Sequence, residues 1–205
     1  MDFFERLEEA RNRWNVLSHP FYERWESGEL GEDELAYYAG EYRHAVVALA
    51  QTAAQAATAD PELREHAEEE AAHVALWDTF AWTAGADAGR PARAETAECV
   101  RSWTAAADEL EALAILYAVE SGQPAISETK LAGLVEHYGY SAEGPATAYF
   151  RLHSELDRAH ADQARRLLEQ KAGPDDEERL LVAASGALAG NWTLLDGVQH
   201  AFSVR

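Results

Sequence analysis

Cysteine and lysine are scarce in this 205-residue sequence, which holds one cysteine, Cys99, and two lysines, Lys130 and Lys171. A single cysteine excludes an intrachain disulfide and any zinc site built from paired cysteines. The sequence also lacks a continuous apolar run of 18 residues and a basic segment followed by an apolar stretch near its start. We therefore expect no membrane span and no secretion signal, and a cytoplasmic location.

Basic residues are outnumbered, because 17 lysines and arginines stand against 37 acidic residues and leave a net charge of −20. A field of that sign repels phosphate backbones and anionic membrane surfaces. We therefore expect neither a nucleic-acid partner nor a membrane partner. The length and the apolar content of 47% fit one domain over residues 1–205 with a sizeable core.

Convincing strand-like alternation is missing, and helical spacing dominates the chain. Apolar residues recur at steps of three and four through 31–57, as Leu35, Tyr38 and Tyr42 illustrate. Glycine and proline separate further apolar-periodic segments, which predict helices over 61–84, 95–120, 126–138, 145–171 and 175–202. The sequence predicts an all-α bundle of about seven helices, with a site in the buried space between them.

The strongest chemical signal is a set of three side chains, His153, Asp157 and His160. At 100° per residue on a helix they point within about 60° of one another. An imidazole, a carboxylate and a second imidazole on one face can all bind a metal. A solvated polar face is the alternative, because Ser154 and Glu155 lie among them.

Two other helices offer ligands of the same kind. Glu70 and His73 stand three residues apart, and Glu120 ends a strongly apolar segment where an unpaired buried carboxylate would be costly. Three carboxylates and three imidazoles on three helices can bridge two metal ions, and this mixture of oxygen and nitrogen suits iron or manganese better than structural zinc. The alternative is a non-catalytic helical binding protein in which these side chains are polar packing.

Four segments occur in the same order as in a known protein family: 19–30 (HPFYERWESGEL), 73–80, 116–139 and 149–160. They resemble the haem-oxygenase-like di-iron oxidases, within the wider superfamily of thiaminase II and pyrroloquinoline-quinone synthase C. The likeness spans about residues 15–165. Within this group it is greatest to the branch of the Chlamydia protein associating with death domains and its bacterial relatives, which make 4-aminobenzoate for folate synthesis.

This resemblance implies a haem-oxygenase-like bundle and a metal-dependent oxidoreductase, with two ferrous ions, O2, an external reductant and a homodimer. Manganese is the alternative metal at either position. The implied metal ligands are Glu70, His73, Glu120, His153, Asp157 and His160. The family's remaining glutamate usually lies seven residues before the first histidine, where this chain has His66. We expect Glu70 to take that role, with Glu69 as second choice and His66 left open.

In the 4-aminobenzoate branch a tyrosine of the protein is thought to supply the ring and a lysine the amino group. The matching positions hold Tyr22 and Lys130, and Tyr38 is a further matching aromatic residue. Val119 departs from the branch, which commonly has tyrosine there. Cys99 does not match the thiaminase nucleophile, so thiamine hydrolysis is disfavoured. The alternatives are a single-metal or cofactorless oxidase, or a di-iron oxidase acting on a diffusible amino acid, fatty acid or quinone precursor.

Overall fold

The computed structural model describes residues 2–58 and 60–203, which are almost entirely helical and contain no strand. Three short 3₁₀ turns, η1 (Val16–Ser18), η2 (Pro61–Leu63) and η3 (Pro145–Thr147), connect some of the helices. The α-helices of the described residues are α1 (Phe3–Arg13), α2 (Pro20–Glu26), α3 (Glu32–Ala56), α4 (Arg64–Thr83), α5 (Ala94–Trp103), α6 (Glu109–Glu120), α7 (Gln123–Glu136), α8 (Ala148–Lys171) and α9 (Glu177–Phe202). The predicted all-α fold class is confirmed.

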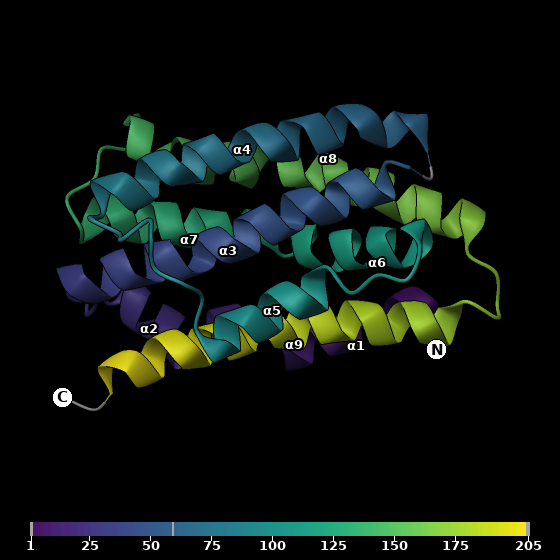
Figure 1. The fold of residues 1–205 in the computed structure, drawn as a ribbon, viewed down its shortest axis with the longest axis horizontal. Coiled ribbons are helices and arrows are strands. Elements are labelled where there is room, and N and C mark those ends of the chain that lie inside the picture. Colours follow the sequence, from purple (N-terminus) through teal and green to yellow (C-terminus); the bar gives the residue numbers. More distant parts are fainter. Residues whose placement is uncertain (1, 59, 204–205) are drawn as a thin grey trace.

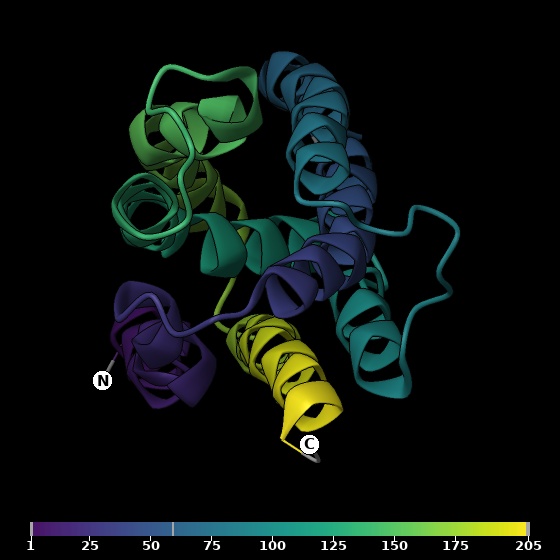
Figure 2. The ribbon, with the colours of Figure 1, turned by 90° about the vertical axis from the view of Figure 1, so that its left-hand side faces the viewer.

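The bundle is elongated, and the long helices α3, α4, α8 and α9 run along its length (Figure 1). Helix α6 lies at the centre, where it packs against α3, α8 and α9, and Figure 2 shows these helices arranged around it. Every residue of α6 from Ala112 to Glu120 is buried. A helix that is apolar on all sides belongs in a core, so Glu120, at its last position, is a carboxylate held inside the protein.

The region predicted as one helix over 95–120 is two helices, so that part of the prediction was wrong. Residues 104–108 form a loop between α5 and α6. The break is stabilised by Asp108, whose side chain accepts a hydrogen bond from the Glu111 amide, while Glu111 accepts one from the Ala107 amide. These two bonds satisfy amide groups that the start of α6 would otherwise leave unpaired. No glycine or proline marks the break, so the alanine-rich sequence concealed it.

Helix α7 begins at Gln123, three residues before the predicted start, with Pro124 in its first turn. Proline is tolerated there because the first amides of a helix have no intrahelical partner. Further along α7, Gly133 allows a close approach of α2, since a Cβ at this position would lie 2.5 Å from Trp25 Nε1. The Trp25 indole donates a hydrogen bond to the Lys130 carbonyl oxygen. This contact fixes the part of α7 that carries Lys130.

None of the helices in the described part of the chain combines the length and hydropathy that a membrane span requires.

Candidate metal centre and the adjoining aromatic chamber

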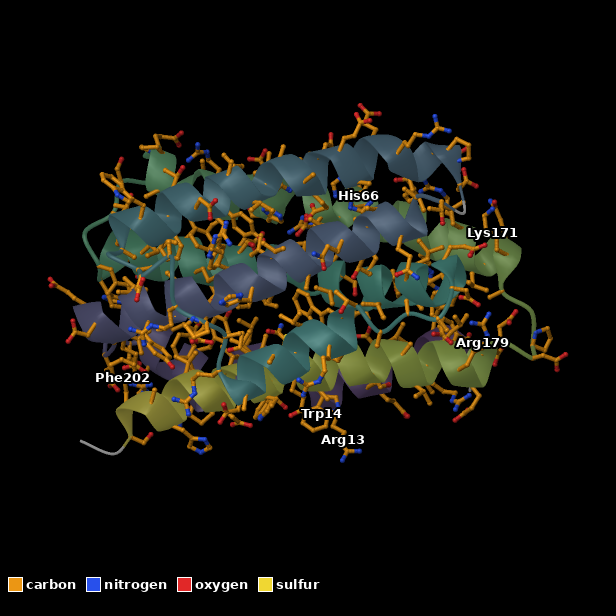
Figure 3. All side chains as sticks on the ribbon, in the orientation of Figure 1. Arg13, Trp14, His66, Lys171, Arg179 and Phe202 are labelled. Atoms are coloured by element: carbon orange, nitrogen blue, oxygen red, sulfur yellow. The ribbon has the colours of Figure 1, made fainter. Side chains whose placement is uncertain are left out.

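Helices α4, α6 and α8 bring a buried set of histidines and carboxylates together. In one group, His66, Glu70, Glu120 and His160 each offer a ligand atom, and these four atoms lie within 4.8 Å of one another. The His66 Nε2 atom lies 2.7 Å from Glu120 Oε1, and the rings of His66 and His160 stack 3.8 Å apart. His66 is labelled on α4 in Figure 3, and only 3% of it is exposed.

A second group shares one residue with the first. Glu70, His73 and His153 also offer three ligand atoms within 4.8 Å of one another. The Oε1 atom of Glu70 lies 2.9 Å from His73 Nδ1 and 3.8 Å from His153 Nε2. Glu70 therefore stands between two sets of nitrogen donors and belongs to both groups of potential metal ligands.

Asp157 completes the predicted set and is fully buried on α8. Neither of its carboxylate oxygens has a hydrogen-bond partner in the described residues, and Oδ1 lies 3.9 Å from His160 Nδ1. Burial raises the pKa of Asp157, and the neighbouring carboxylates of Glu120 and Glu70 raise it further. An isolated carboxylate would not be placed here without a compensating cation.

Two hydrogen bonds orient the imidazoles of α8. The His153 Nδ1–H group donates to the Tyr149 carbonyl oxygen at 2.8 Å, which leaves Nε2 without a partner. The His160 Nε2–H group donates to Glu69 Oε2 at 3.0 Å, which leaves Nδ1 without a partner. When one ring nitrogen donates a hydrogen bond, the other carries the free lone pair that a metal requires. Both rings are thus held in a form ready to bind a metal ion.

Unpartnered polar atoms concentrate in this cluster. Among the described residues, six of the eleven buried side-chain nitrogen and oxygen atoms without a hydrogen-bond partner belong to it: His66 Nδ1, Glu120 Oε2, His153 Nε2, both Asp157 oxygens and His160 Nδ1. Buried polar groups are normally paired, so such a concentration calls for a missing partner. Burial also lowers the pKa of His153 to about 4, which keeps that ligand neutral. The residues present fit a first-row divalent metal ion.

Lys130 lies in a chamber of aromatic rings beside the cluster. Its side chain is 1% exposed, and its Nζ atom stands 4.3 Å from the centre of the Tyr42 ring. Burial lowers the pKa of the Lys130 ammonium to about 7. The other rings within 6 Å of this nitrogen are those of Trp77, Tyr38, Phe150 and Tyr22. Lysine is rare in this chain, and this one is enclosed and can lose its proton near neutral pH.

The chamber connects to the candidate metal ligands through ring contacts. The hydroxyl groups of Tyr22 and Tyr38 lie 3.5 Å apart, and burial raises the pKa of both. Trp77, which also contacts the Tyr38 ring, meets Tyr149 edge-on at 4.9 Å between ring centres. The Tyr149 ring stacks on His153 at 3.9 Å. The structure therefore brings Tyr22, Tyr38 and Lys130 together, with one aromatic layer between this chamber and the histidines.

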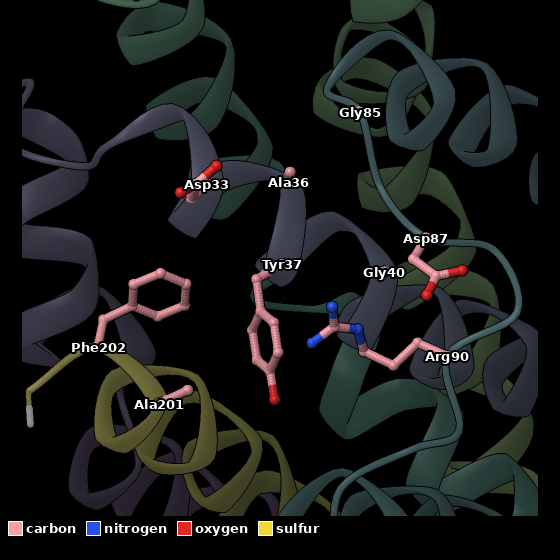
Figure 4. Close-up of a pocket in the computed structure, with 9 residues that line it drawn as sticks. All are labelled: Asp33, Ala36, Tyr37, Gly40, Gly85, Asp87, Arg90, Ala201 and Phe202. Carbon is pink, nitrogen blue, oxygen red and sulfur yellow. The ribbon is translucent and has the colours of Figure 1, made fainter.

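One surface pocket lies away from this chamber. A pocket of about 420 Å³ between the first half of α3, the α4–α5 loop and the end of α9 contains Asp33, Asp87 and Arg90 (Figure 4). Its Arg90 guanidinium covers the Tyr37 ring at 4.6 Å. None of the candidate metal ligands lines this pocket, so it is separate from the cluster.

Comparison with known proteins identifies the family. The family model described as iron-containing redox enzyme matches residues 44–191, which is well over half of the chain and includes every candidate metal ligand. The chain belongs to the iron-containing redox enzyme family. As a member it is an oxidoreductase, and its buried histidine and carboxylate cluster fits a metal site.

Curated relatives of this iron-containing redox enzyme cover nearly all of the chain. A 4-aminobenzoate synthase of Chlamydia muridarum is 29% identical over 96% of this chain and 89% of its own length. A protein of the same name from Nitrosomonas europaea is 25% identical over 97% of this chain and 91% of its own length. The predicted resemblance to this branch is confirmed.

Solved structures support the fold. A domain of unknown function with a haem-oxygenase-like fold from Shewanella denitrificans aligns with a TM-score of 0.82, at 17% identity, over 100% of this chain and 94% of its own. A TenA homologue from Pseudomonas syringae aligns with the same TM-score, at 13% identity, over 97% and 93%. The haem-oxygenase-like bundle predicted from the sequence is confirmed.

Sequence reasoning left the assignment on α4 open, and the structure separates the three candidates. Glu70 and His66 are both buried in the cluster, whereas Glu69 has 40% of its side chain exposed and contacts only the outer nitrogen of His160. His66 lies seven residues before His73, two helical turns away and therefore on the same face. That spacing is the signal that could have placed His66 in the cluster together with Glu70.

Proposed function

We propose that this protein is a di-iron oxidase that uses O2 and an external reductant to form 4-aminobenzoate from its own Tyr22 and Lys130. The observation that supports it best is the enclosure of the Lys130 amine among tyrosine rings, one ring layer from a candidate metal ligand. The printed name of the Chlamydia and Nitrosomonas relatives supports the product. A homodimer is part of the expectation from the resemblance and stays a prediction.

The ligand set of this proposal follows the two groups of donors. His66, Glu120 and His160 would hold one iron ion, His73 and His153 would hold the other, and Glu70 would contact both. Asp157 lies beside them with both oxygens unpartnered. Manganese is the alternative at either position, because nitrogen and carboxylate donors suit both metals. The bound metals supply the redox chemistry with O2.

The protein's own residues prepare the reacting groups. Burial keeps a substantial fraction of Lys130 as a neutral amine at pH 7, and only a neutral amine can act as a nucleophile. The Tyr22 phenol keeps its proton at neutral pH because burial raises its pKa. Its hydroxyl group lies 3.5 Å from that of Tyr38, so one phenol can donate a hydrogen bond to the other and hold it in place. The surrounding rings exclude water from both groups.

Isotope labelling tests the origin of the product. Protein containing ¹³C-ring tyrosine and ¹⁵N-side-chain lysine is loaded with Fe²⁺, reduced and exposed to O2 without any added aromatic compound. We expect 4-aminobenzoate that carries both labels, in a yield of at most about one per chain, since a consumed residue cannot turn over. Peptide mass spectrometry is expected to show modification at Tyr22 and Lys130 in the same fraction of chains.

Two variants sharpen this experiment. Tyr22→Phe removes the phenol and Lys130→Arg replaces a deprotonatable amine with a permanent cation, so both should stop product formation while iron binding persists. Tyr37→Phe is the matched control, because Tyr37 lies on α3 outside the chamber, in the surface pocket of Figure 4. Unlabelled product formed many times per chain from an added small molecule would instead establish a diffusible substrate.

The contact between Glu69 and His160 gives a separate prediction about metal affinity. Glu69 accepts the outer hydrogen of a proposed ligand, and loss of such partners typically weakens metal binding 10- to 100-fold. We expect Glu69→Gln to weaken Fe²⁺ binding by about tenfold, with full iron content at saturating metal. Competition with a chelator under anaerobic conditions measures the affinity. An unchanged affinity would show that Glu69 is only a surface contact.

A further inference from the structure

A cavity of about 280 Å³ lies on the side of the bundle away from α4, between α1, η1, the α6–α7 junction and α9. Trp14, which lines it, and His66 of the metal cluster lie on opposite sides of the bundle in Figure 3. Its walls are mostly apolar, with Leu17, Ile126 and Leu188 among them. That volume is at the lower end for small-molecule sites and suits one substituted ring.

The polar groups of this cavity are few. Arg11 is the single charged residue among those lining it, in a chain of net charge −20. One guanidinium nitrogen, NH1, pairs with Glu8 at 2.9 Å, and the buried Nε atom has no partner in the described residues. Asn191 is 8% exposed, and its Oδ1 atom also lacks a partner. The residues that line this apolar cavity therefore include a cation with an unpartnered donor atom, Arg11 Nε, and an amide with an unpartnered oxygen, Asn191 Oδ1.

The cavity is separated from the aromatic chamber by a thin wall. Asn191, which lines the cavity, also faces the Tyr42 hydroxyl group, to which Gln123 donates a hydrogen bond at 3.3 Å. The Lys130 nitrogen lies over a face of the same Tyr42 ring, 4.3 Å from its centre. Val119 lines the cavity directly before Glu120.

We propose that this cavity binds a single-ring aromatic carboxylate with a hydrogen-bond donor at the opposite ring position, with its carboxylate at Arg11 and its donor at Asn191. The identity of the physiological ligand rests on the proposed function, under which it is 4-aminobenzoate leaving the chamber past Tyr42. The apolar walls stabilise the ring, and the two polar groups select its orientation. In this acidic protein, the positive charge of Arg11 stabilises the negative charge of the bound carboxylate.

Direct binding tests the site without turnover. The full chain, kept anaerobic so that no product forms, is titrated by calorimetry with 4-aminobenzoate, with benzoate and with aniline. We expect 4-aminobenzoate to bind more tightly than either compound that lacks one polar group. Ala125→Trp, at an exposed position on the cavity wall, should weaken binding at least tenfold. Ala132→Trp, at an exposed position of the same helix outside the cavity, is the matched control.

Substitutions of the two polar residues test which group of the ligand each residue binds. Arg11→Met should weaken 4-aminobenzoate and benzoate by about tenfold and leave aniline unchanged, because only the first two carry a carboxylate. Asn191→Leu should weaken 4-aminobenzoate and aniline but leave benzoate unchanged. Thermal melts confirm that each variant is folded, and the Arg11 result stands alone if Asn191→Leu unfolds.

The outcomes separate this proposal from the proposed function. Binding that neither Ala125→Trp nor Arg11→Met changes would overturn the cavity assignment, even if labelled product is formed. If no labelled product forms but both variants weaken 4-aminobenzoate binding, the proposed reaction is overturned. The cavity then remains a site for aromatic carboxylates. Absence of measurable 4-aminobenzoate binding at millimolar concentration would also overturn the cavity assignment.

Discussion

Replacing Glu70 with alanine is expected to remove metal from both positions of the cluster. Glu70 is the one residue that belongs to both groups of potential ligands, and its Oε1 atom approaches both His73 and His153. In a di-iron cluster Glu70 would contribute charge and a ligand atom to each ion, so its loss would weaken the binding of both. Protein reconstituted with Fe²⁺ under anaerobic conditions should retain about two iron ions per chain in the wild type and well under one in this variant.

Neighbouring glutamates on α4 provide the controls. Glu68 is exposed and Glu69 contacts only the outer nitrogen of His160, so Glu68→Ala and Glu69→Ala should keep their full iron content at saturating metal. Glu70→Gln keeps the volume and removes the charge, and should behave as Glu70→Ala does. Circular dichroism shows whether each metal-free variant retains its helices. Full iron content in Glu70→Ala together with loss in Glu69→Ala would mean that the ligand position lies one residue earlier.

The parts of the fold and site that depend on neighbouring residues along one helix could be predicted from the sequence. The i, i+4 and i+7 spacing of His153, Asp157 and His160 places them on one face whatever packs against it, and all three are buried together in the structure. The same local logic placed Glu70 and His73 side by side. Helical periodicity is fixed by backbone geometry, so it survives without any knowledge of the tertiary structure.

The parts that depend on packing between helices could not be predicted. Nothing local shows that His66 meets Glu120, 54 residues away, or that Lys130 is enclosed by rings from α2, α3, α4 and α8. The resemblance singled out Lys130, but its depressed pKa is a product of the packing alone. The end of α5 at Trp103 was missed for a related reason, since the side chains that stabilise the break, Asp108 and Glu111, are of a residue type that is common throughout this acidic sequence.

The enclosure of Lys130 leads to a large expected effect on stability. Its pKa falls from 10.5 in an unfolded chain to about 7 in the folded protein because burial disfavours the ammonium. Between these two values the unfolded chain binds one more proton than the folded chain, so the free energy of unfolding rises with pH. The gain is about 1.4 kcal/mol per pH unit. Between pH 7 and pH 9 the wild type should gain about 2–3 kcal/mol from this residue.

Lys130→Met removes the titrating group and keeps a flexible apolar side chain of similar length. We expect this variant to be more stable than the wild type at pH 7 and the difference to shrink by about 2–3 kcal/mol at pH 9. Urea unfolding of metal-free protein at both pH values measures it. Lys171→Met is the matched control, because Lys171 is partly exposed and pairs with Asp60 at the surface. A difference between Lys130→Met and wild type that does not change with pH would show that Lys130 stays charged.

The titration of Lys130 should also affect the rate of the proposed reaction, which can be measured separately from stability. If the neutral Lys130 amine supplies the nitrogen, the rate of 4-aminobenzoate formation should rise as pH increases through about 7 and then level off. The yield should remain at or below about one per chain at every pH, because each chain has one such lysine. Iron content measured in the same samples excludes metal loss as the cause of the pH dependence. A rate that is flat from pH 6 to pH 9 with full iron content would remove Lys130 as the nitrogen donor, even if the stability prediction holds.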